Sequence, residues 1–96
     1  MMITQTDLLS TSLCAAVAEE IRGVRAIIEQ LAETLVCDER FATDYLDQLQ
    51  SFDLVIQQAD ESADLLDRVA QGQTIHEAID RVRLTVIQER LRAAIG

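Results

Sequence analysis

The chain has 96 residues, with no proline, three glycines, 49% apolar residues and 26% charged residues. A chain of this length forms one domain, and the scarcity of turn-forming residues excludes a small sheet-rich fold. Its 17 acidic residues outnumber its 8 basic ones, for a net charge of -9. This balance disfavours nucleic acid and anionic membranes as partners, because both are bound through lysine and arginine, and a basic protein partner fits better.

A first helix is predicted from about residue 6 to about residue 36. Apolar residues recur there at alternating steps of three and four, which places them on one helical face. They are Cys14, Val17, Ile21, Val24, Ile28, Leu31 and Leu35. The first 20 residues lack a basic segment, and serine and threonine interrupt their apolar residues, so they indicate neither a signal peptide nor a membrane span. We therefore expect a cytoplasmic protein.

A second helix is predicted from about residue 39 to about residue 71, with apolar residues at the same alternating steps. Asp38 breaks the register between the two segments. Two structures satisfy this pattern: one helix of more than fifty residues, or a hairpin that turns at residues 36–40. The hairpin is favoured because Asp38 is a good N-cap and Glu39 would follow it in a first turn, where negative charge is stabilised.

A third helix is predicted from about residue 75 to about residue 94. Gly72 suits the end of the helix before it, and Thr74 and Glu77 have the spacing of a capping box. The chain is thus expected to be a single all-α domain, residues 1–96. One short third helix cannot cover two long apolar stripes. We therefore expect a homodimer in which two hairpins pack face to face as a four-helix bundle.

The second predicted helix also carries a polar strip beside its apolar stripe. Asp53 and Gln57 lie one turn apart on one face, next to Gln50 and Asp60. A glutamine amide both donates and accepts hydrogen bonds and so can orient a water molecule, whereas a carboxylate can pair with a partner's lysine. Phosphoryl hydrolysis depends mainly on positioning and charge stabilisation. The two side chains are therefore candidate catalytic groups if a partner supplies the metal and the phosphate.

An Asp-x-x-x-Gln spacing on the second arm of a long dimeric helical hairpin resembles the CheZ-type chemotaxis phosphatases. The resemblance implies that Asp53 and Gln57 insert into the phosphorylated receiver domain of a response regulator. Gln57 would then orient the attacking water, and Asp53 would engage the receiver's lysine. It also implies that the partner holds Mg²⁺ and that the chain has no cofactor of its own. We expect Gln50, Leu46 and Asp60 to contact the same partner.

A non-catalytic helical adaptor is the alternative function. Small acidic hairpin proteins that resemble flagellar export chaperones bind a partner's amphipathic helix in a groove of a bundle. Exposed apolar residues on the outer helix faces would then carry the function, and the candidates are Leu9, Leu13, Leu46, Leu54 and Leu84. The phosphatase requires Asp53 and Gln57 to be exposed, whereas the adaptor requires an exposed apolar groove.

Overall fold

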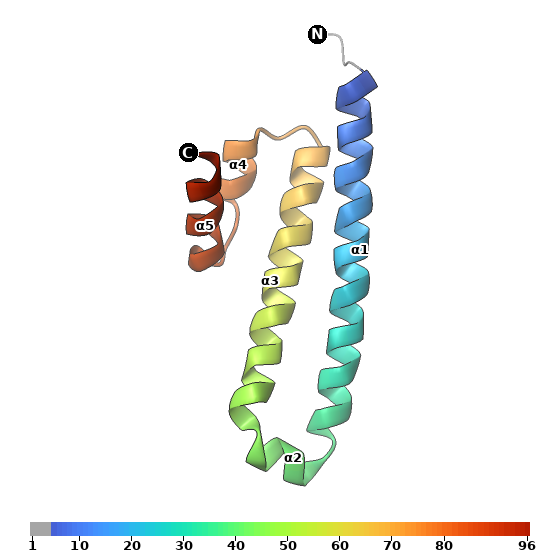
Figure 1. Cartoon of the computed structure of the whole chain (residues 1–96), viewed down its shortest axis with the longest axis vertical. Coiled ribbons are helices and arrows are strands. Elements are labelled where there is room, and N and C mark those ends of the chain that lie inside the picture. Colours follow the sequence, from blue (N-terminus) through green and yellow to red (C-terminus); the bar gives the residue numbers. More distant parts are fainter. Residues whose placement is uncertain (1–4) are drawn as a thin grey trace.

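The computed structural model describes residues 5–96, with side chains from residue 8 onward. Every regular element in this part of the chain is an α-helix, which confirms the all-α prediction. The elements are α1 (Gln5–Val36), α2 (Glu39–Asp44), α3 (Leu46–Ala70), α4 (Ile75–Asp80) and α5 (Thr85–Ile95). The two long helices, α1 and α3, lie side by side and run in opposite directions (Figure 1).

A turn, rather than one continuous helix, joins the two long segments. α1 ends at Val36, and Asp38 adopts the extended backbone of an N-cap, with φ -87° and ψ 104°. The Asp38 side chain accepts a hydrogen bond of 3.0 Å from the Phe41 backbone N–H, and Glu39 lies in the first turn of α2. The predicted cap and the hairpin are therefore confirmed.

The predicted helix over residues 39–71 is divided at Tyr45 into α2 and α3, and in this respect the prediction was wrong. Tyr45 leaves the helical conformation, with φ -126° and ψ 35°, while its ring stacks on that of Phe41 with centroids 4.7 Å apart. Its N–H still donates to the Phe41 carbonyl at 2.9 Å, and its carbonyl accepts from the Leu49 N–H at 3.0 Å. These two hydrogen bonds connect the chain across the kink, and α2 forms the base of the hairpin (Figure 1).

Small side chains and ion pairs hold α1 against α3. Ala18 of α1 and Ala63 of α3 are completely buried. The Arg22 guanidinium donates to the carboxylates of Asp67 at 2.6 Å and Asp64 at 3.1 Å. The hydrogen bond to Asp67 is the main cause of the raised pKa of Arg22. These pairs join residues far apart in sequence, so they fix the register of the two antiparallel helices.

The seam between α1 and α3 buries less of α1 than the sequence predicts. Ile21, Ile28 and Leu35 of the predicted stripe are half-buried. The side chains of Val17, Val24 and Leu31 instead remain exposed. The hairpin therefore covers one edge of the stripe and leaves the other edge open.

α3 ends at the predicted glycine. Gly72 has a φ of +100°, a left-handed conformation that glycine adopts without steric cost. Its N–H donates to the Val69 carbonyl at 3.1 Å, and the Gln73 N–H donates to the Arg68 carbonyl at 3.1 Å, which together form a Schellman motif. The predicted capping box follows: the Thr74 hydroxyl accepts from the Glu77 N–H, and the Glu77 side chain accepts from the Thr74 N–H.

The expected single helix over residues 75–94 is instead two short helices, α4 and α5, so that prediction was wrong. The Arg83 backbone N–H donates to the Glu61 carboxylate at 3.2 Å and not to a carbonyl one turn earlier. The Gln88 side-chain amide donates hydrogen bonds to the last carbonyl groups of α4, those of Ile79 and Asp80, each at 3.2 Å. Val82, between the two helices, is buried. A tertiary contact thus satisfies the Arg83 N–H, whereas the Val82 N–H donates to the Ile79 carbonyl at 3.0 Å.

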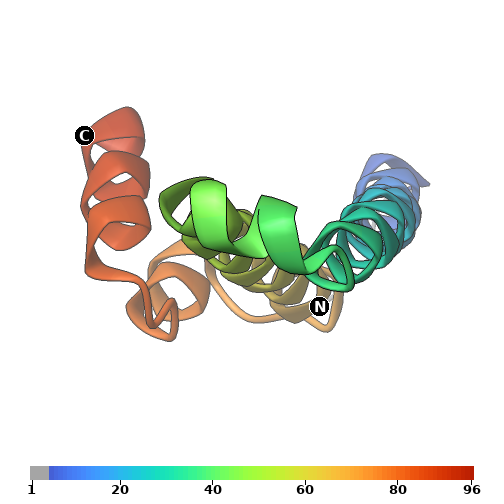
Figure 2. The ribbon, with the colours of Figure 1, turned by 90° about the horizontal axis from the view of Figure 1, so that it is seen from below.

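The helices form one curved layer, with α1 and α5 on opposite sides of α3 (Figures 1 and 2). The molecule measures 59 × 24 × 16 Å, so it is elongated and flat. A layer of this thickness has two large faces and little interior. No helix among residues 5–96 is long and apolar enough to cross a membrane.

Candidate functional site

The five residues predicted as a site share one side of α3. Leu46, Gln50, Asp53, Gln57 and Asp60 follow one another at alternating steps of four and three, so they form a single stripe, which we call the polar face. Asp60 is half-buried and the other four residues are exposed. Asp53 and Gln57 form no hydrogen bond or ion pair with another described side chain. Both groups are therefore free to meet a partner.

Asp53 lines a hollow between α3 and α1. The walls carry three carboxylates, those of Asp53, Glu29 and Glu33, and one cation, Arg25. Arg25 already pairs with Glu29 and lies 3.0 Å from Asp60, so its charge is shared. The remaining lining residues are apolar: Ala32, Val36 and Ile56. The hollow thus combines an excess of negative charge with an apolar floor.

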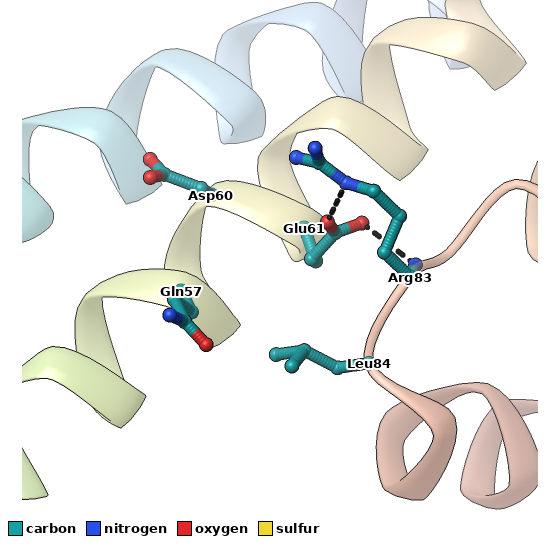
Figure 3. A pocket seen from close by; sticks show the side chains of 5 residues that line it. All are labelled: Gln57, Asp60, Glu61, Arg83 and Leu84. Atoms are coloured by element: carbon teal, nitrogen blue, oxygen red, sulfur yellow. Dashed lines mark hydrogen bonds and ion pairs between the residues drawn. The ribbon is translucent and has the colours of Figure 1, made fainter.

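Gln57 lines a different hollow, on the side of α3 that faces the α4–α5 link. Asp60, Glu61, Arg83 and Leu84 complete its lining. Figure 3 shows the Gln57 amide pointing into this hollow toward Leu84, whereas the Asp60 carboxylate points away from it. The structure therefore brings Gln57 and Asp60 to one hollow and places Asp53 at another. The two hollows are one helical turn apart along the same face.

Glu61 and Arg83 have structural roles in this region that the sequence did not predict. Glu61 is 4% exposed, and its carboxylate accepts from the Arg83 Nε at 2.7 Å as well as from the Arg83 backbone N–H. The hydrogen bond to Glu61 is also the first cause of the raised pKa of Arg83. In sequence Glu61 lies among other acidic residues, and no local signal distinguishes it from Asp60 and Asp64, which are only half-buried. Only its burial identifies it as the attachment point of the C-terminal helices.

The polar face offers an amide and a carboxylate that can bind and orient other groups. Gln57 supplies an amide that can position a water molecule, and Asp53 supplies a free carboxylate. Within the described residues, no group of three or more histidine, cysteine, aspartate or glutamate side chains is placed to hold a metal ion.

Comparisons with models of protein families, with curated proteins and with solved structures found no match to this chain.

Proposed function

We propose that the protein is a helical adaptor that binds a basic surface of a signalling protein on the polar face of α3. One observation carries this proposal: Asp53 and Gln57 are exposed on a rigid helix without a side-chain partner of their own. Unpaired carboxylates on an acidic chain attract positively charged surfaces and guide their approach. The polar face is therefore the best candidate for partner recognition.

The hollow at Asp53 fits one lysine or arginine side chain of such a partner. The aliphatic stem of either residue can lie on apolar surface while its charged head remains at the rim. Here Ala32, Val36 and Ile56 supply the apolar surface, and Asp53 and Glu33 supply the charge at the rim. Arg25 does not neutralise these two groups, because it pairs with Glu29 and Asp60.

We further propose that the adaptor is a homodimer whose long helices form a four-helix bundle. The chain exposes 7172 Å² of surface, whereas a compact monomer of 10.7 kDa exposes roughly 5,500 Å². The excess of about 1,700 Å² is larger than the area of about 800 Å² that each partner buries in a standard protein interface. A second hairpin packed against the first would remove this excess and leave the polar faces outside.

Dephosphorylation of a receiver domain is a second candidate function. The observation that favours it is the free Gln57 amide, one turn from the free Asp53 carboxylate. With Asp53 on the receiver's lysine, Gln57 would aim a water molecule at phosphorus. The bond between phosphorus and the aspartyl oxygen of the receiver would break, releasing inorganic phosphate and restoring the carboxylate. Mg²⁺ held by the receiver would stabilise the charge of the transferring group.

Binding and phosphate release can be measured on the same panel of receiver domains from the same cell, phosphorylated with a small acyl phosphate in the presence of Mg²⁺. Asp53→Ala is expected to weaken binding about fivefold or more, because it removes one of the two charges at the rim of its hollow. Gln57→Ala is expected to leave binding nearly unchanged. If the second candidate is right, Gln57→Ala also abolishes the accelerated release of phosphate.

Gln71→Ala is the matched control, because Gln71 is an exposed glutamine at the C-terminal end of α3, several helical turns from Gln57. It should behave like the parent in both measurements. Phosphate release that is unaltered by the protein would remove the second candidate and leave the adaptor. Binding that is unaffected by Asp53→Ala would exclude the polar face as the docking surface.

A further inference from the structure

The side of the layer away from the polar face is an extended apolar surface. On α1 the stripe Leu13, Val17, Glu20, Val24, Ile27 and Leu31 runs at alternating steps of four and three, and all six residues are exposed. On α3 the neighbouring exposed residues are Leu54 and Val55, and on α5 the exposed residue is Val86. We call this surface the apolar face.

Two adjoining hollows shape the apolar face. The first lies between α1 and α3 and is lined mainly by apolar residues, among them Val17, Val24 and Val55. The second lies between α3 and α5 and is lined mainly by Leu54, Leu84, Val86 and Ile87. Gln58 borders both, so the two hollows are continuous across α3.

Each hollow contains one charged residue, and the two charges are opposite. Glu20 lines the hollow between α1 and α3, and Arg90 lines the hollow between α3 and α5. Neither forms an ion pair with another described residue. A single unpaired charge within an apolar surface is unfavourable to bury unless an opposite charge meets it. A covering partner must therefore present a cation to Glu20 and an anion to Arg90.

A second copy of this chain meets both requirements. Glu20 lies at the middle of α1 and Arg90 at the middle of α5. Figure 1 shows α5 at the height of the first half of α1, with α3 between the two helices. A two-fold axis parallel to the long axis of the molecule preserves heights and exchanges the two sides. It places α1 of one copy against α5 of the other, and α3 against α3.

We propose that two copies pack by their apolar faces in this parallel arrangement, with Glu20 of each copy paired with Arg90 of the other. The inference rests on the proposed homodimer but changes its geometry, because α1 then packs against α5 of the other copy and the four long helices do not form a bundle of their own. The interface is isologous, so one pair type occurs twice. The polar faces then point outward on opposite sides, and the dimer offers two docking sites for the signalling partner.

Reversing the charges at Glu20 and Arg90 tests the arrangement, with dimerisation measured by sedimentation equilibrium at micromolar concentration. Glu20→Arg alone places two arginines together, and Arg90→Glu alone places two carboxylates together, so each is expected to raise the dimer dissociation constant about tenfold or more. The variant with both changes restores opposite charges in both pairs and should dimerise nearly as well as the parent.

A mixture of the two single variants tests the Glu20–Arg90 pairing most directly. In a mixed dimer Arg at position 20 of one chain meets Glu at position 90 of the other, and the second pair keeps the parental Glu20 and Arg90. The mixed dimer should therefore form with nearly parental affinity although neither variant dimerises well alone. Glu33→Arg and Arg81→Glu, which alter exposed charges outside both hollows, control for net charge.

The outcomes separate the homodimer from its geometry. A parent protein that sediments as a monomer would overturn both, and would leave the apolar face to a helix of another protein, as in the export-chaperone alternative. The parent could instead be dimeric while neither charge reversal changes the dimer dissociation constant, or while mixing the single variants does not restore dimerisation. Either result would overturn the Glu20–Arg90 pairing but not the homodimer.

Discussion

Asp38 decides where the chain turns. It is the residue that breaks the apolar register in sequence, and in the structure its carboxylate accepts the Phe41 N–H at the start of α2. Without this cap, the first N–H groups of α2 would depend on water alone. Because the side chain is exposed, its effect on stability comes from the hydrogen bond and the interaction with the helix dipole rather than from packing.

Asp38→Ala is expected to lower the free energy of unfolding by about 1 kcal/mol, the usual effect of removing an N-cap side chain. Thermal or urea unfolding followed by circular dichroism measures this change. Asp38→Asn keeps the acceptor and should lose much less. A protein stabilised by Asp38→Leu would contradict the turn, because leucine is favourable there only in a continuous apolar seam.

The C-terminal helices are attached to the hairpin as a unit by side chains of α3. Glu61 binds both the backbone N–H and the side chain of Arg83, and Arg68 donates to the Ala78 carbonyl at 2.8 Å. Ala78, Ile79, Val82 and Ile87 are buried beneath these contacts. α4 and α5 together have only 17 residues, too few for stable isolated helices. Their structure therefore depends on α3.

Glu61→Ala is expected to destabilise the protein by about 1.5 to 3 kcal/mol, the range for a lost hydrogen bond to a charged group. Arg83 is 81% exposed and can turn to water, so the loss should fall toward the lower end of that range. Amide hydrogen exchange should show residues 75–95 losing protection before the seam of α1 and α3. Glu61→Gln retains an acceptor for the Arg83 N–H and should show a smaller loss. Equal loss of protection in the hairpin would contradict this attachment.

The whole molecule is a thin layer with one polar and one apolar face. Its radius of gyration is 16.7 Å, whereas a compact domain of this length has about 12.5 Å. The seven buried apolar residues include three alanines, so the described core is small for a stable domain. A small core of this kind is what the proposed dimer would supplement by burying the apolar face.

Val24→Asp is expected to convert the proposed dimer into a folded monomer. Val24 is 56% exposed within one chain, so the charge disturbs the hairpin little but places an unpaired carboxylate in the proposed interface. Sedimentation equilibrium gives the mass, and circular dichroism checks the helices. Leu46→Asp is the matched control, because Leu46 has the same exposure on the polar face. A dimer unaffected by Val24→Asp would exclude the apolar face as its interface.

The local elements of this fold could be predicted from sequence because their signals act over a few residues. The start of α2 at Asp38, the end of α3 at Gly72 and the capping box of α4 each depend on a side chain or backbone within one helical turn. The placement of the five predicted site residues on one face of α3 follows from helical periodicity in the same way.

The remaining features depend on residues distant in sequence. Periodicity predicts one continuous third helix. The Glu61 carboxylate, however, accepts a hydrogen bond from the N–H of Arg83, 22 residues later, and the helix is interrupted.

The apolar stripe of α1 is likewise wide enough to pack along either edge. The pairs of Arg22 with Asp64 and Asp67 fix how α1 lies on α3, and they leave Val17, Val24 and Leu31 outside. Asp53 and Gln57 share a face by periodicity, yet they line separate hollows because α1 lies on one side of α3 and the α4–α5 link on the other. Local hydrogen bonding thus determined from the sequence alone where helices begin and end at Asp38, Gly72 and Thr74, whereas contacts between helices decided where the third helix is interrupted and which faces remain open.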